Sequence, residues 1–394
     1  MRSQKIIQRQ WARGGKYLLG VLLLTGADLS WAQNRELKFS TSCDPQNTLI
    51  TISFVGDVLV HKPLYQSVVG GSKDFSQIWR RTNSLIQKAH FSVANLEGPA
   101  ALGVDASGRD RGDIGFVYDG SVYSGTNFVF NYHPRILANL QQSGYDLLTI
   151  ANNHALDRGS LGIDKTVMAA RNLELPIIGI RHSSERNAPF HKVVDIKGIK
   201  VAFLGCTEAT NGMNDRKDQV LHCYRGKTVE NLVRDLAQNS DVDAVIVYPH
   251  WGDEYHQSPN GDQRDYARKW LEAGATAVIG SHPHVLEPWE KYVTRDGRET
   301  FIAYSLGNFV AGQQGLEKRT GVVVYLGLSQ EGHQKAKVFG AAYTPTYRDG
   351  WEIFPVGDGN SKEVLNHTAK LFGTGNRLNP EQSLPKKLCP SLRR

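Results

Sequence analysis

Apolar and polar residues alternate from Leu49 to Phe54, and this run ends at the pair Gly56-Asp57. A period of two residues is typical of a strand with one buried face, and a Gly-Asp pair is typical of the turn that follows it. We therefore expect the folded core to begin with a strand at Leu49 that ends near Asp57.

Strands and helices alternate along most of the chain that follows. Pro134 opens a helical pattern that stops at Gly144, and Lys197-Gly198 is the expected turn of a hairpin. Such alternation is typical of a mainly parallel sheet covered by helices, here with a later antiparallel portion. The other expected strands are 91–97, 145–151, 175–180, 242–249, 275–280, 301–305 and 322–328, and the other expected helices are 160–173, 227–239 and 262–273.

These elements predict one domain across residues 49–345, because no Pro-rich or Ser-rich linker interrupts them. Within it, residues 103–131 are rich in Gly, Asp and Ser and predict a long surface insertion. Residues 33–48 are polar and predict a linker, and residues 346–394 predict a weakly patterned C-terminal tail. An apolar share of 40% and a charged share of 22% are ordinary for a soluble globular protein.

The first 32 residues have the three parts of a secretory signal peptide. Five basic residues precede an apolar run from Tyr17 to Ala27, and Ser30-Trp31-Ala32 supplies small residues for cleavage. The alternative is an uncleaved membrane anchor, but this run is shorter than the roughly 20 apolar residues that span a bilayer. We expect an exported protein, periplasmic or extracellular and associated with the cell envelope.

The charge of the chain changes once that segment is set aside. The whole sequence carries +7, and residues 1–32 hold five basic residues and one acid, which leaves +3. So weak a bias does not indicate a nucleic-acid partner. A small basic cluster near the end of the chain could contact an anionic polymer or a membrane, but a solvated tail is the simpler interpretation. Its members are Lys386, Lys387, Arg393 and Arg394.

Four cysteines follow the predicted signal, in what export would make an oxidising compartment. Of the three possible pairings we favour a short local loop, Cys206 with Cys223, and a link between the two ends of the mature chain, Cys43 with Cys389. None of the four stands in a CxxC arrangement, so a cysteine zinc site or a thioredoxin-like redox motif is disfavoured.

Metal-capable side chains follow nearly every expected core strand. In open α/β sheets ligands bind beyond the carboxyl ends of the strands, so these residues are expected to converge. Carboxylate, imidazole and amide groups together suit Mn, Fe, Zn or Mg. A lone aspartate could instead cap a turn, and a lone histidine could be structural. The residues are Asp57, Glu97, Asn152, Asn153, His154, His250, His282 and His284, the last two as alternate residues of an extended segment that face the same way.

The segments around these residues resemble the CapA family of poly-γ-glutamate capsule synthesis proteins, a branch of the calcineurin-like metallophosphatase fold. The resemblance covers roughly residues 49–312 and implies an α/β fold of layered β-sheets flanked by helices, with a metal site at the carboxyl ends of strands. The motifs that carry it, in family order, are Phe54-Val55-Gly56-Asp57, Ala94-Asn95-Leu96-Glu97-Gly98-Pro99, Ala151 to Gly159, His250 to Tyr255, Gly280 to His284 and Tyr304 to Phe309.

The resemblance also implies a role for each residue. Asp57 and His284 would bind a first divalent ion, and Glu97 would bridge it to a second. Asn153, His250 and His282 would complete the second site. His154 would be a general acid for the leaving group, and Asp157 would orient its ring or cap a helix.

Two departures from the metallophosphatase pattern leave the first ion open, so we expect one or two. Leu59 stands where that pattern has a histidine, the nearest imidazole is His61, and Asn95-Leu96-Glu97 replaces Gly-Asp-x-x-Asp. The pair Glu254 and Tyr255 follows the CapA pattern, and the resemblance implies that it contacts substrate, although a plain surface glutamate is an equal alternative.

The resemblance implies a role in making, exporting or anchoring poly-γ-glutamate or a related anionic capsule polymer, with membrane synthase partners. We expect a metal-dependent, hydrolase-like site. The alternatives are a non-catalytic component that binds polymer or synthase, and a phosphoesterase without a capsule role. Fold by itself does not decide among them.

Overall fold

The computed structural model describes residues 36–126 and 129–389. The predicted signal peptide, Arg393 and Arg394 lie outside these residues. Among the helices described, none is both long enough and apolar enough to cross a membrane.

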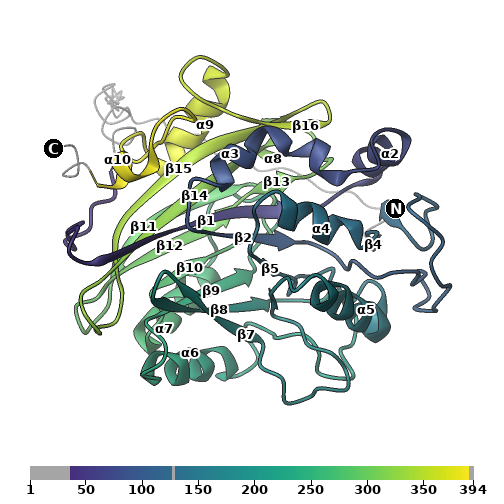
Figure 1. Cartoon of the computed structure of the whole chain (residues 1–394), viewed down its shortest axis with the longest axis horizontal. Helices are drawn as coiled ribbons and strands as arrows, with labels where there is room; N and C mark the ends of the chain where they lie inside the picture. The colour runs from purple at the N-terminus through teal and green to yellow at the C-terminus, as the bar shows by residue number, and fades with distance from the viewer. Residues whose placement is uncertain (1–35, 127–128, 390–394) are drawn as a thin grey trace, which may run out of the picture.

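The first sheet has eight strands and carries β1 at its centre (Figure 1). Strands β1, β2, β5 and β6 run parallel, whereas β14, β15 and β16 form an antiparallel extension on the other side of β1. In order across the sheet they are β16 (Glu352–Pro355), β15 (Lys337–Asp349), β14 (Thr320–Gln330), β1 (Thr48–Val58), β2 (Phe91–Leu96), β5 (Leu147–Thr149) and β6 (Ile177–Ile178), with β13 (Asn308–Val310) also paired to β1.

The second sheet has six strands, of which β8, β9, β10 and β12 are parallel. The hairpin predicted at Lys197-Gly198 is confirmed, and both residues have positive φ (51° and 93°), as a type I′ hairpin turn requires. In order across the sheet the strands are β11 (Leu286–Val293), β12 (Glu299–Leu306), β10 (Ala277–Ile279), β9 (Ala244–His250), β8 (Ile199–Thr207) and β7 (His191–Ile196).

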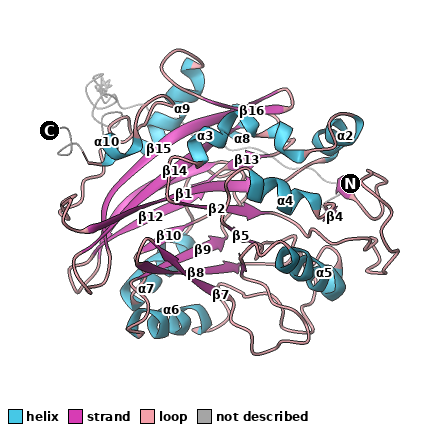
Figure 2. Ribbon diagram, in the orientation of Figure 1, coloured by secondary structure: helices cyan, strands magenta, loops and turns pink. Residues whose placement is uncertain are grey.

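The two sheets pack face to face, with helices on both outer faces (Figure 2). The alternation from Leu49 explains the packing: Ile50, Ile52 and Phe54 enter the core between the sheets, whereas Ser53 on the other face donates to the Ile86 carbonyl at 3.4 Å. Helices α2 (Lys62–Gly70), α3 (Asn83–Ile86), α4 (Arg135–Gln142) and α5 (Gly159–Asn172) cover the first sheet, and α6 (Thr228–Gln238) and α7 (Gly261–Ala273) cover the second.

The layered α/β architecture is therefore confirmed, but the single mainly parallel sheet expected from the strand pattern is wrong. Strand periodicity reports which face of a strand is apolar, and it does not report which other sheet that face meets. The two sheets bury their inner apolar faces against each other, and helices α2 to α7 cover the outer faces.

The residues after 345 belong to the folded body. The predicted boundary falls inside β15, and the chain continues through β16 to α9 (Lys362–Phe372) and α10 (Leu384–Leu388). Phe372 closes one side of the core between the sheets, where its ring lies 5.0 Å from that of Trp289. The predicted linker is also anchored, because the Leu37 N–H donates to Asn376 Oδ1 at 2.6 Å.

Both predicted disulfides are confirmed. Cys206 and Cys223 have Cα atoms 5.0 Å apart, and Cys43 and Cys389 have Cα atoms 5.6 Å apart. The second bond joins the two ends of the described chain and holds them against the core of the first sheet.

Candidate metal centre

The carboxyl ends of strands from both sheets meet at one place. Asp57 is the second-last residue of β1, Glu97 directly follows β2, and His250 is the last residue of β9. Gly56 lets β1 approach its neighbour, because a Cβ atom there would lie 1.8 Å from the Gly307 carbonyl oxygen. The site thus lies between the ends of two sheets and not in the crevice of one.

His282 and His284 reach the site through a strained backbone. Their φ angles are 105° and 59°, in a region that side chains disfavour, so the extended segment expected from the sequence is wrong. The segment Gly280 to His284 turns away from β10, and the two rings end 6.0 Å apart between their centroids. Both histidines lie at the site, His284 buried and His282 half-buried, but they belong to different groups of side chains.

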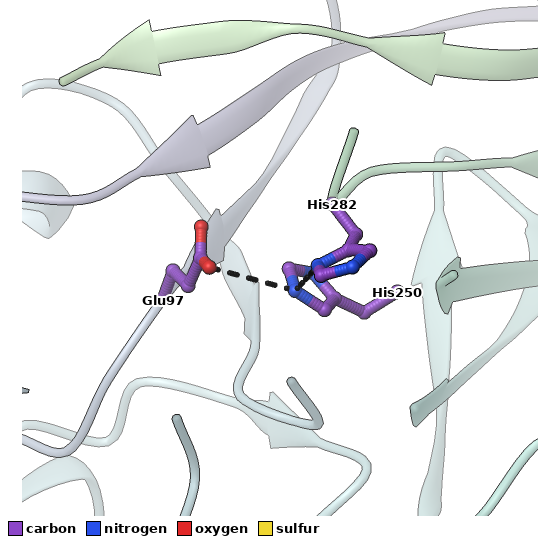
Figure 3. Close-up of side chains that lie close together, drawn as sticks. All are labelled: Glu97, His250 and His282. Carbon is purple, nitrogen blue, oxygen red and sulfur yellow. Dashed lines mark hydrogen bonds and ion pairs between the residues drawn. The ribbon is translucent and has the colours of Figure 1, made fainter. Parts of the chain in front are cut away.

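Two groups of metal-capable atoms share one carboxylate. In the first group Asp57, Glu97 and His284 each offer an atom within 4.8 Å of the others, and in the second Glu97, His250 and His282 do the same. Figure 3 shows the second group, with Glu97 directed at the His250 ring and His282 beside it. Glu97 therefore stands where the resemblance implies a bridging ligand.

The second group is the tighter of the two. His250 Nε2 lies 3.0 Å from His282 Nδ1 and 2.9 Å from Asn153 Oδ1. Atoms that share an ion at about 2.1 Å are roughly 3 Å apart, so these three fit one ion. On the other side of the ring His250 Nδ1 lies 3.1 Å from Ser281 Oγ, which can accept its proton and leave Nε2 free to bind metal.

Hydrogen bonds with neighbouring asparagines orient the side chains of the first group. His284 Nδ1 lies 3.2 Å from Asp57 Oδ2 and 3.0 Å from Asn308 Oδ1, which leaves Nε2 directed toward Glu97 at 3.7 Å. Asn95 donates to Asp57 Oδ1 at 2.8 Å. Leu59, where the metallophosphatase pattern has a histidine, is buried, and His61 belongs to neither group of described residues.

Glu97 is the least satisfied charged group of the site. It is fully buried, and neither carboxylate oxygen has a hydrogen-bond partner among the described residues. Burial alone would raise the pKa of Glu97, but the nearby His284 and His250 rings outweigh it and lower that pKa. An ionised carboxylate in this position costs on the order of several kcal/mol unless cations lie beside it. The donor set and its unpaired oxygens fit a divalent metal ion.

The imidazoles respond to the same charges. Burial lowers the pKa of His284, but Glu97 and Asp57 raise it to about 9. Burial together with His250 and His284 lowers the pKa of His282 well below its ordinary value. The surrounding charges therefore favour the protonated form of the His284 ring and the neutral form of the His282 ring.

His154 lies beside Glu97 and is held by an aspartate. Its Nδ1 atom is 2.8 Å from Asp157 Oδ2, and its Nε2 atom is 3.9 Å from Glu97 Oε1. Burial would lower the pKa of His154, but the hydrogen bond and charge of Asp157 raise it. The ring can therefore carry a proton next to the metal-capable groups, with Nε2 as the atom that gives it up.

The predicted surface insertion forms a wall of this site. The Phe130 N–H donates to Asp157 Oδ2 at 2.6 Å, and the Phe130 ring meets the His154 ring edge-on at 4.7 Å. Arg158 is fully buried and donates to the carbonyls of Val104 and Val122 in the insertion. The strands β3 (Ser124–Thr126) and β4 (Val129–Asn131) lie in this segment.

Glu254 and Tyr255 lie at the rim. The Tyr255 side chain is 47% exposed, and its ring lies 6.1 Å from that of His284. Burial and Glu254, which hydrogen-bonds to the phenol, raise the pKa of Tyr255 to about 12. The pair is therefore placed where substrate could reach it.

Several polar residues of the site were not singled out in the sequence. Asn95, Ser281 and Asn308 contact the metal-capable residues, and all three stand inside the motifs quoted for the resemblance. Gln313 and Lys318 stand just beyond the last motif, and no signal in the sequence marked them.

A family model and two curated relatives match most of the chain. The family model described as bacterial capsule synthesis protein PGA_cap matches residues 51–313. The PGA biosynthesis protein CapA of Bacillus subtilis is 28% identical over 315 residues, 78% of this chain and 75% of that one. The capsule biosynthesis protein CapA of Bacillus anthracis is 25% identical over 323 residues, 80% and 72% of the two chains.

Solved structures give weaker matches. A 5'-nucleotidase precursor from Thermus thermophilus is 12% identical and has a TM-score of 0.43, over 82% of this chain and 58% of that one. A 5'-nucleotidase from Candida albicans has a TM-score of 0.37, over 85% and 58% of the two chains at 12% identity.

Proposed function

Because this chain belongs to the bacterial capsule synthesis protein family PGA_cap, we propose that it acts in the synthesis, export or anchoring of poly-γ-glutamate or a related anionic capsule polymer. The CapA relatives support this role through their descriptions as capsule and PGA biosynthesis proteins. Membrane synthase components and the polymer itself would be its partners.

The proposal extends to chemistry at the metal centre. The observation that carries it is Glu97, a buried carboxylate with two unpaired oxygens between two groups of metal-capable side chains. Asp57 and His284 would hold one divalent ion, and Asn153, His250 and His282 a second, with Mn, Fe, Zn or Mg as the chemical options. Bound ions would supply a nucleophilic water and neutralise charge on the oxygen of the bond that is cleaved.

The protein's own groups account for the remaining steps. Asp157 holds Nδ1 of His154, so Nε2 is the atom that protonates the leaving group. Phe130 packs edge-on against the His154 ring and shields it from bulk water on that side. Asn95 and Asn308 fix the orientation of Asp57 and His284, so that the ligands are in place before substrate arrives.

The proposed location is outside the cytoplasm. Two disulfides among the described residues suit an oxidising compartment. N-terminal sequencing of the protein from an envelope fraction tests export: a chain that begins at Gln33 supports cleavage after Ala32, and an intact Met1 would favour a membrane anchor.

Two substitutions separate catalysis from metal binding. We expect His154→Ala to keep the metal and lose roughly 100-fold or more in turnover, whereas His282→Ala loses metal and activity together. The assays are metal content by mass spectrometry, hydrolysis of phosphoester and γ-glutamyl substrates, and polymer yield in cells.

The polymer yield decides between an enzyme and a non-catalytic binding component. Loss of polymer in His154→Ala with metal retained supports catalysis. Full yield in His154→Ala, with loss in His282→Ala, would identify the metal as a structural clamp in a binding protein. Full yield with both substitutions would remove the site from the function.

A further inference from the structure

An exposed aromatic ring stands next to the buried metal centre. Tyr255 is 47% exposed, whereas His284, whose ring lies 6.1 Å away, is 2% exposed. The Tyr255 backbone has φ 67°, and its N–H donates to the Pro283 carbonyl at 2.7 Å. Tyr255 is thus held in a disfavoured conformation by the same segment that carries the candidate ligands His282 and His284.

A lysine from a distant part of the chain lies over this ring. Lys318 belongs to α8 (Leu316–Arg319), and its ammonium nitrogen is 4.8 Å from the centroid of the Tyr255 ring. In the part of the chain that the structure describes, no ion pair joins Lys318 to a carboxylate. Its positive charge is therefore available to a ligand that rests on the ring.

One asparagine connects this lysine to the metal centre. The Asn308 amide lies within hydrogen-bonding distance of the carbonyls of His284 (3.0 Å) and Lys318 (2.9 Å), and also of Gln313 Oε1 (2.8 Å). Gln313 in turn donates to the Tyr255 hydroxyl at 3.2 Å. The metal-capable His284, the ring and the lysine therefore keep fixed relative positions, as a binding site for an extended ligand requires.

We propose that Tyr255 and Lys318 form a subsite that takes an anionic group of the substrate beside the metal centre. The inference rests on the proposed function, because that function places substrate at the metal centre. The ring supplies a flat apolar surface, and the ammonium supplies a charge-assisted hydrogen bond. Glu254 binds the phenolic hydroxyl, so an anion reaches Lys318 over the ring face, away from that carboxylate. A carboxylate and a phosphate share the required chemistry.

Binding of charged and neutral oligomers tests the subsite. The probes are fluorescein-labelled oligoglutamate, oligoglutamine of the same length and polyphosphate, with affinity measured by fluorescence anisotropy. The proteins are the wild type, Tyr255→Ala, Lys318→Met, Lys318→Arg and, as a matched control on the exposed edge of β7, Lys192→Met. Each is assayed metal-loaded and after treatment with a chelator.

We expect Lys318→Met to weaken binding of oligoglutamate about tenfold, to leave oligoglutamine unchanged and to keep the metal content of the wild type. Lys318→Arg should restore binding because it keeps the charge, and Tyr255→Ala should weaken both peptides because it removes the surface. A loss for polyphosphate alone would identify phosphate as the anion that the subsite takes.

Equal affinities of Lys318→Met and Lys192→Met for both anionic probes would overturn the proposal. Failure of the proposed function has a different signature, namely a wild-type protein that binds no metal. The Lys318 effect is expected to persist in chelator-treated protein, since the ammonium needs no ion, so the two failures are distinguishable.

Discussion

The two ends of the paired sheets carry similar kinds of side chain under opposite conditions. At the carboxyl ends of β9 and β10, charged and amide groups are buried, and Glu97 has no hydrogen bond to any described residue. At the amino ends of the same strands lies a polar cavity of about 700 Å³, whose lining includes Asp243, Glu299, Arg298 and Lys335.

The charged groups of that cavity have ordinary partners. Arg298 donates to the carbonyl of Leu271 at 2.6 Å, and Lys335 to that of Asn239 at 2.7 Å. The Glu299 carboxylate accepts from the Ser40 N–H at 2.5 Å. Cavity size therefore does not distinguish the two ends as candidate sites, whereas a buried charge without a hydrogen-bond partner does, and it marks the candidate metal centre.

The sharpest way to break this comparison is to neutralise one carboxylate at each end. Glu97→Gln should lower metal affinity at least 100-fold, because it removes the shared anionic ligand. It should also destabilise the metal-free protein by on the order of a few kcal/mol, because the lowered pKa of Glu97 means that folding favours the ionised carboxylate, and the amide leaves the buried His284 ring with less negative charge beside it. Metal content by mass spectrometry and urea unfolding after chelation measure the two effects.

The control is Glu299→Gln at the other end, which should keep the metal and lose under about 1 kcal/mol of stability, because the carboxylate is near solvent. Wild-type metal content in Glu97→Gln would show that the unpaired carboxylate is not a ligand.

The two disulfides allow the two ends to be compared by their effect on stability, because the chain segment that lines the cavity leads directly to Cys43. Cys43→Ser with Cys389→Ser opens a link across 346 residues, and Cys206→Ser with Cys223→Ser opens one across 17. Loop entropy predicts losses of about 6 and about 3 kcal/mol in the free energy of unfolding, respectively. Urea unfolding measures both pairs, and a larger loss for the local loop would contradict the ranking.

The last expected effect concerns the pH dependence of stability and involves a carboxyl group near the candidate metal centre. Glu287 is buried on β11, and burial raises its pKa to about 8, although Gln263 donates to it at 2.7 Å. Between pH 4.5 and 8 the folded state holds a proton that the unfolded chain has lost, so this contribution to stability decreases as pH rises through that range.

Glu287→Gln keeps a neutral side chain at every pH and should remove the decrease. The measurement is the difference in unfolding free energy between wild type and variant from pH 5 to pH 9, expected to change by on the order of 1 to 3 kcal/mol. Parallel curves across that range would show that Glu287 titrates as an ordinary carboxyl.

Local patterns predicted the elements whose structure depends on local rules. The alternation from Leu49 to Phe54 predicted β1, and the Pro134 start and Gly144 stop predicted α4. The strands β11, β15 and β16 and the helix α9 were not predicted. Pro345 inside β15 argues against a strand, but it lies one residue outside the pairing with β16, where a missing N–H is tolerated.

The candidate site likewise contains residues that the sequence identified and residues that only the structure revealed. Asp57, Glu97, His250 and His282 could be identified because each follows an expected strand. Lys318 could not, since it approaches Tyr255 only after β13 and α8 return the chain to the site. The sequence likewise predicted only a surface insertion around Phe130. The contact of Phe130 with His154 could not be predicted, because it depends on how the buried Arg158 holds the insertion.

The sequence by itself determined which residue types end the strands and which family the motifs resemble, because these are carried by order and spacing along the chain, and it favoured one of three cysteine pairings. Only the tertiary structure decided that two sheets face each other and that Glu97, buried and without a hydrogen-bond partner among the described residues, lies between two groups of metal-capable side chains. The physical reason is that burial, unpaired oxygens and the approach of distant charges are properties of packing, which bring together residues that no local pattern relates.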